Sequence, residues 1–222
     1  MTKKEIAVIT AVTGRYDHIG RQEMIDECDY IFFTDDVTAP FPNDWVRYYL
    51  PDIGRDDRRR SKLPKLNPHA FPVLETYEYV VWIDGDMQIV NPNFPREIIE
   101  YMENGFVLSP HFDGRDCAYG EATIRPLKYE NEPLDEQVEA YEKDGFPHNY
   151  GLYECGVLAR RMKTPGLKEL GELWHEQNLK WSYQDQVSLP YCLWKQQFTP
   201  DVLPQTFRNM NWVHINAHKR ED

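Results

Sequence analysis

Residues 6–12, Ile-Ala-Val-Ile-Thr-Ala-Val, form a short run that is apolar on both faces of a strand. Successive side chains of a strand point to opposite faces, so this run belongs in a sheet that is covered on both sides. Residues 79–83, Tyr-Val-Val-Trp-Ile, show the same pattern. Sheets of this kind are mostly parallel and are flanked by helices. We therefore predict an α/β fold with a Rossmann-like, mostly parallel central sheet flanked by helices.

Turn residues and hydrophobic periodicity indicate where the other elements lie. Further strands are predicted at residues 30–34, 46–50, 87–90, 106–108 and 155–158. Helices are predicted at residues 19–28, 93–104, 134–144 and 185–194, and another is opened by Thr164-Pro165. Residues 113–149 are polar, charged and aromatic, and we interpret them as an excursion from the sheet that carries specificity.

Size and charge limit the classes of protein to which the chain can belong. Its 222 residues fit one domain, residues 1–222, and 41% hydrophobic residues suffice for a large core. A net charge of -12 disfavours a protein whose main task is to bind a nucleic-acid backbone. The four cysteines are scattered, which indicates reduced thiols and a cytoplasmic protein. No stretch is long enough to span a membrane.

The tripeptide Asp84-Gly85-Asp86 follows the second doubly apolar strand. Two carboxylates at a strand end can converge on a hard cation such as Mn²⁺ or Mg²⁺, which prefers oxygen ligands. Such a cation would bridge the two phosphates of a nucleoside diphosphate. We expect Gly85 to adopt a positive φ and to let a ligand approach. The alternative is an ordinary Asp-Gly hairpin turn between two strands.

Basic side chains gather at residues 55–65, shortly before the acidic strand. Arg60, Lys62 and Lys65 could meet a diphosphate there, and the alternative is a solvated basic turn. Near residue 215, His214 or His218 could complete a metal shell, and Lys219 could reach a phosphate. The alternative for these last residues is a frayed tail.

Two other segments combine amides and carboxylates with aromatic rings. Residues 149–157 and 183–188 have a composition that suits sugars, although capping and packing would also explain it. Residues 13–17 and 34–36 follow the first two strands and would suit nucleoside recognition, with simple loop chemistry as the alternative.

The chain carries four motifs in a fixed order. They are Thr13-Gly14-x-Tyr16-Asp17, Phe33-Thr34-Asp35, Ser61-Lys62-x-Pro64-Lys65-x-x-Pro68-His69-x-Phe71 and Trp82-Ile83-Asp84-Gly85-Asp86. This order resembles a glycosyltransferase-like family found in plants and bacteria. That family is itself similar to the family-8, glycogenin-like enzymes of GT-A fold. The resemblance spans nearly the whole chain, and the Ser-Lys-x-Pro-Lys stretch is its most specific part.

The resemblance implies a GT-A fold and a metal-dependent transfer of a sugar from a nucleoside diphosphate sugar, expected to be UDP-linked. The acceptor would be a carbohydrate or another hydroxyl compound, and retention at the anomeric carbon is favoured. Plant members carry a membrane anchor and stem before this domain, and a chain without either is expected to be a soluble bacterial or viral enzyme or a shortened form of a longer protein.

The resemblance also implies roles for individual residues. The implied catalytic residues are Asp185, Gln186 and Glu154. The implied donor-binding residues are Thr10, Ala11, Val12, Tyr16, Asp35, Arg60, Lys62, Lys65, Asp84, Gly85 and Lys219. The implied metal ligands are Asp84, Asp86, His214 and His218. Family-8 enzymes end their site with His-x-x-Gly-x-x-Lys-Pro-Trp, and residues 214–219 lack the Gly and the Pro-Trp, so the choice between the histidines stays open.

Two other functions compete with the transferase. A phosphohydrolase could use Asp84 as its nucleophile, but that pattern usually continues with Gly and Thr, whereas Met87 and Gln88 follow here. A non-catalytic carbohydrate-binding or nucleotide-binding module is the second alternative.

Overall fold

A seven-stranded sheet forms the centre of the computed structural model, which describes residues 4–16, 19, 22, 25–40, 45–124 and 129–216. The strands are β1 (Ile6–Val12), β2 (Cys28–Thr34), β3 (Val46–Tyr49), β4 (Tyr79–Ile83), β6 (Phe106–Pro110), β7 (Tyr153–Arg161) and β8 (Asp201–Val202). Their order is β3-β2-β1-β4-β7-β6-β8. Within the described part of this seven-stranded sheet, only β7 runs antiparallel to its neighbours. The predicted α/β fold with a mostly parallel sheet is therefore confirmed.

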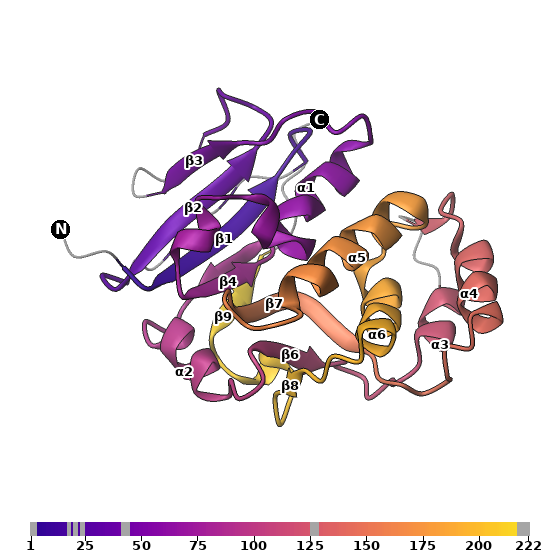
Figure 1. Cartoon of the computed structure of the whole chain (residues 1–222). Coiled ribbons are helices and arrows are strands. Elements are labelled where there is room, and N and C mark those ends of the chain that lie inside the picture. The colour runs from indigo at the N-terminus through magenta and orange to yellow at the C-terminus, as the bar shows by residue number, and fades with distance from the viewer. Residues whose placement is uncertain are drawn as a thin grey trace.

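Helices cover both faces of the sheet (Figure 1). One face packs against α1 (Asp57–Leu66), α5 (Leu167–Lys180) and α6 (Asp185–Gln196), and the other packs against α2 (Phe94–Glu100). The alternation along β1 explains this arrangement, because Ile9 lies in the first core and Val8 lies in the second. The excursion carries α3 (Ala118–Thr123) and α4 (Leu134–Lys143), which lie at the opposite end of the molecule from β3.

A separate two-stranded sheet holds the segment after the acidic turn. β5 (Met87–Ile89) pairs antiparallel with β9 (Val213–Ile215) and not with β4. The hairpin alternative is therefore wrong, since Asp84-Gly85-Asp86 connects two different sheets. Asn216 donates its backbone N–H to the Asp86 carbonyl at 2.8 Å, which joins β9 to this turn.

Some element boundaries differ from the predictions. The basic run at residues 57–66 forms helix α1, so the solvated-turn alternative is wrong. Asp56 caps this helix by accepting a hydrogen bond from the Arg59 backbone N–H at 3.0 Å. Helix α2 ends at Glu100, before the predicted residue 104. Of the helix predicted at residues 19–28, residues 20, 21, 23 and 24 lie outside the described residues, and Cys28 begins β2.

The remaining short elements are the 3₁₀ turns η1 (Pro68–Ala70), η2 (Leu74–Thr76) and η4 (Phe207–Asn209). All four cysteines lie in the described part of the chain and carry free thiols. Among the helices that the structure describes, none has the length and apolar character needed to cross a bilayer.

Candidate active site

The carboxylate of Asp84 has a defined orientation at the C-terminal end of β4. The Asp84 backbone N–H donates to the Gly156 carbonyl at 2.9 Å, which joins the turn to β7. Its Oδ1 accepts a hydrogen bond from Trp82 Nε1 at 2.8 Å. Trp82 and Asp84 are two residues apart at the end of a strand, so their side chains lie on the same face. Ligands of open α/β sheets bind beyond this edge.

Gly85 is needed for space and not for a special backbone conformation. Its φ is not positive, so that part of the prediction is wrong. A Cβ atom at this position would lie 2.8 Å from Val12 Cγ2 and 3.6 Å from the Ala11 carbonyl. The turn therefore packs directly against the end of β1, where a side chain would not fit without a shift.

Two lysines of α1 meet the acidic turn and the start of α6. Lys65 Nζ lies 3.0 Å from Asp84 Oδ1 and 2.7 Å from Asp185 Oδ2. Lys62 Nζ lies 2.7 Å from the same Asp185 oxygen. We call these four residues the lysine cluster: Lys62, Lys65, Asp84 and Asp185. The structure thus brings together four of the residues predicted for the site.

Charge and burial within the lysine cluster set the protonation states. Burial alone would raise the pKa of the Asp185 carboxyl, but the ammonium groups of Lys62 and Lys65 overcome it and lower that pKa. Burial opposes a charged Lys65, but the Asp185 and Asp84 carboxylates raise its pKa. Burial lowers the pKa of Lys62, which contacts one carboxylate and lies near a second ammonium group. Asp185 therefore stays ionised at neutral pH.

The ends of β1 and β2 form a second polar group. Asp35 accepts from the Gly14 backbone N–H at 3.1 Å and lies 3.2 Å from Arg60 Nη1. An open groove of about 510 Å³ lies here, lined by Gly14, Arg15, Asp35, Asp36, Val37 and Tyr49. The two segments proposed for nucleoside recognition, residues 13–17 and 34–36, therefore come together where they are described.

The other residues predicted at the end of β1 have different surroundings. Thr10, Ala11 and Val12 are buried, so a contact with a donor would come from the backbone of this strand. Tyr16 is exposed, and the Arg58 guanidinium lies 5.4 Å from the centre of its ring.

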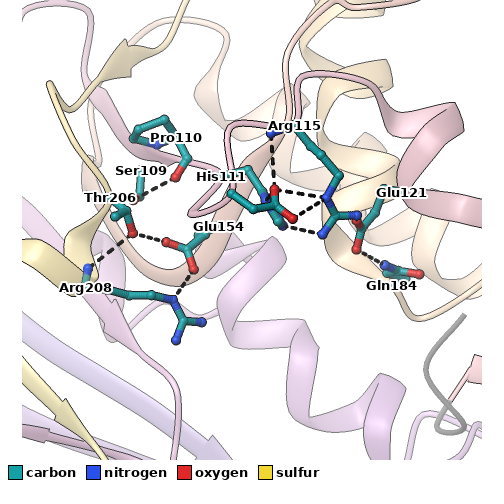
Figure 2. A network of polar contacts seen from close by, with 10 residues as sticks. Ser109, Pro110, His111, Arg115, Glu121, Glu154, Gln184, Thr206 and Arg208 are labelled. Carbon is teal, nitrogen blue, oxygen red and sulfur yellow. Dashed lines mark hydrogen bonds and ion pairs between the residues drawn. The ribbon is translucent and has the colours of Figure 1, made fainter. Parts of the chain in front are cut away.

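Glu154 lies outside the contacts of the lysine cluster. It is buried, accepts a hydrogen bond from Thr206 Oγ1 and pairs with Arg208 Nε (Figure 2). Its neighbour Cys155 packs into the core under α1 and α6. Adjacent side chains on a strand point to opposite faces, so Glu154 points toward η4 and away from Asp185.

A chain of polar contacts runs from the start of α6 to the loop after β6, as Figure 2 shows. Gln184 precedes Asp185 and donates from Nε2 to Glu121 Oε1 at 2.7 Å. Glu121 pairs with Arg115, which also contacts Asp113. Gln186, the other predicted catalytic residue, donates its backbone N–H to Asp185 Oδ1 at 3.1 Å.

The predicted metal ligands come only partly within the described residues. His214 lies on β9 opposite Gln88 and is exposed, whereas His218 and Lys219 lie outside the described residues. In the described ranges, no group of three or more His, Cys, Asp or Glu side chains is arranged to hold a metal. Mg²⁺ is usually held by one or two carboxylates together with substrate phosphates, so the pair Asp84 and Asp86 fits such an ion.

Sequence reasoning missed several contacts of the site. The Trp82–Asp84 hydrogen bond follows from strand alternation and could have been found. The Arg208–Glu154 pair joins residues 54 positions apart, and no local pattern indicates it.

Comparisons with known proteins give the following results. A family model described as TOD1/MUCI70, glycosyltransferase-like domain, matches residues 52–220. Among solved structures, an apo structure of the bifunctional glycosyltransferase WbbM is similar, with a TM-score of 0.49 and 12% sequence identity. That match covers 92% of this chain, which spans 39% of the other. No curated protein matches the chain.

Proposed function

Because this chain belongs to the TOD1/MUCI70 glycosyltransferase-like family, we propose that it is a metal-dependent glycosyltransferase. It transfers a sugar from a nucleoside diphosphate sugar, with UDP as the expected nucleotide, to a carbohydrate or another hydroxyl acceptor. The observation that carries this proposal is the lysine cluster at the C-terminal end of β4, where two ammonium groups and two carboxylates converge.

In this proposal Asp84 and Asp86 hold Mn²⁺ or Mg²⁺, completed by His214 or His218. When bound, the cation neutralises charge on the diphosphate as the glycosidic bond breaks. The carboxylate of Asp84 is already oriented by Trp82 and Lys65, which supports its role as a ligand.

The lysines act on the leaving diphosphate. Lys62 is the better placed of the two, since 18% of its side chain is exposed against 4% for Lys65. Lys65 holds Asp84 and Asp185 in position, and Lys219 would add a further cation. Preorganised charges of this kind stabilise charge that develops in the transition state.

Asp185 is the proposed residue beneath the transferred sugar, with Gln186 beside it. Its ionised carboxylate stabilises positive charge at the anomeric carbon. The bond from that carbon to the diphosphate oxygen breaks with its electron pair on the diphosphate, and the acceptor oxygen bonds to the carbon. In a retaining reaction the acceptor proton passes to the departing diphosphate on the same face. The groove beside Asp35 and Tyr49 takes the nucleoside.

Thermal stabilisation by nucleotides tests this function. We expect one nucleoside diphosphate or its sugar to raise the melting temperature with Mn²⁺ and to lose this effect with EDTA, because a ligand of the native state stabilises it. The variant Asp86→Ala should lose the metal-dependent part, while Glu100→Ala, an exposed carboxylate on α2, should keep it. No response to any nucleotide, together with phosphate release from a simple phosphoester, would favour the phosphohydrolase instead.

A further inference from the structure

Phe112 is an exposed aromatic ring beside an ion pair of which only the carboxylate is buried. It follows β6, and 55% of its surface is accessible. The Arg208 guanidinium lies 5.1 Å from the centre of this ring and pairs through Nε with Glu154. Glu154 itself is buried, with Thr206 as a further partner. The three residues Phe112, Glu154 and Arg208 therefore join a flat apolar surface to a set of polar atoms.

This group adjoins the acidic turn. Glu154 lies two residues before Gly156 on β7, and the Gly156 carbonyl accepts the Asp84 backbone N–H. A molecule bound over Phe112 would thus have one end directed toward the edge of the sheet where Asp84 and Asp86 lie.

The loop that carries Phe112 is fixed on both sides. The His111 backbone N–H donates to the Leu152 carbonyl at 3.2 Å, and the Gly151 N–H donates to the Asp116 carbonyl at 2.9 Å. The chain of contacts from Arg115 through Glu121 to Gln184 then fastens the loop to the start of α6 (Figure 2). A ring that is held in place before binding loses little freedom when a ligand stacks on it.

The charges next to the ring favour a neutral ligand. Arg208 balances Glu154, and Arg115 lies between two carboxylates, Asp113 and Glu121, so no excess of positive charge is present for an anionic ligand. A peptide partner of apolar character would need a larger continuous apolar surface than one ring. A sugar ring combines an apolar face, which can cover Phe112, with hydroxyl groups, which can accept from the accessible Arg208 guanidinium.

We propose that Phe112, Arg208 and Glu154 form the acceptor subsite and that it takes a neutral pyranose stacked on Phe112. The role of this sugar as an acceptor rests on the proposed glycosyltransferase function. The binding of a neutral saccharide can be tested independently of that function. Arg208, whose side chain is 46% exposed, then donates to acceptor hydroxyls, the buried Glu154 holds that guanidinium in position, and Asp185 serves the donor.

Ligand-detected NMR with neutral trisaccharides tests the subsite. The probes are cellotriose, xylotriose, mannotriose and chitotriose, with trigalacturonate as an acidic comparison, each measured with UDP and Mn²⁺ present. We expect a neutral probe to bind wild type through the protons of one ring face. Its affinity should fall roughly tenfold or more in Phe112→Ala, since stacked aromatic rings are common hot spots. The aromatic variant Phe112→Trp should keep binding.

A matched control distinguishes the loss of the Phe112 ring from the loss of any exposed aromatic ring. Tyr101→Ala removes a ring that is 39% exposed at the end of α2, and it should leave saccharide binding unchanged. Stabilisation by UDP should be the same in all these variants.

Three results would overturn the subsite: unchanged binding in Phe112→Ala, no neutral probe bound by wild type, or tighter binding of the acidic probe. Saccharide binding that depends on Phe112 without any nucleotide response would support the subsite and remove the proposed transferase.

Discussion

Two carboxylate centres lie near the same edge of the sheet, and they are held by different cations. In the lysine cluster, Asp185 contacts two ammonium groups from α1. At the other centre, Glu154 contacts one guanidinium and one hydroxyl from the segment around η4. Ammonium groups act as compact point charges that suit phosphates, whereas a guanidinium offers a planar fork of donors. The difference divides the edge into a proposed donor side and a proposed acceptor side.

Burial also distinguishes the two centres. The side chains of Lys65 and Asp185 are 4% and 7% exposed, so neither partner can be replaced by water. Glu154 is 3% exposed, but 46% of its partner Arg208 is accessible. Removing the cation should therefore lower the free energy of unfolding much more in the lysine cluster than at Glu154.

The largest expected effect comes from Lys65→Met. This change leaves the buried Asp185 carboxylate with Lys62 as its remaining partner in the lysine cluster, and removing one partner of a buried ion pair typically costs about 3–5 kcal/mol. Urea unfolding would measure the loss in the free energy of unfolding. The control Lys195→Met removes a partly exposed pair with Asp144 and should cost below about 1 kcal/mol. Equal losses in the two variants would contradict the role given to burial.

An intermediate effect is expected from Arg208→Ala. Glu154 keeps Thr206, and water can enter where Arg208 was, so the free energy of unfolding should fall by about 1–2 kcal/mol. The same urea experiment measures it. Arg96→Ala, which breaks an exposed pair with Glu27, should change it by less than about 1 kcal/mol. A loss as large as that of Lys65→Met would show that the two centres are not different.

The smallest expected effect is on how the stability of the protein changes at acid pH. The folded-state pKa of Asp185 lies below its usual value of 3.8, so its ionised form contributes stability above that pH and loses it as the pH falls further. Wild type should therefore lose stability more steeply than Asp185→Asn between pH 5 and pH 3, by at most about 1.4 kcal/mol per pH unit. Thermal unfolding along a pH series would measure both slopes. Parallel curves would contradict the depressed pKa.

Local patterns predicted most of the sheet and less of the helices. The strand at residues 79–83 matches β4 residue for residue, because apolar runs between turn residues are read directly. Helix α1 was missed because it is rich in charged residues and contains Pro64. Its apolar contribution is small, so periodicity gave no signal there.

The candidate site could be predicted as a set of residues but not as an arrangement. The resemblance supplied Lys62, Asp84 and Asp185 together, yet Lys62 and Asp185 are 123 positions apart and meet only because α1 and α6 both pack against α5. The opposite directions of Asp185 and Glu154 depend on strand alternation in β7 and on the position of η4. Neither can be read from spacing.

The pairing of β5 with β9 also affects when the site is completed during synthesis. The Asp86 carbonyl accepts from Asn216, which is added 130 residues later. At ribosomal rates this delay is on the order of 10 s. A chain released before residue 213 would contain all seven strands of the large sheet and lack the strand that closes on Asp86. All the residues of the large sheet are therefore synthesised before the strand that closes on the acidic turn.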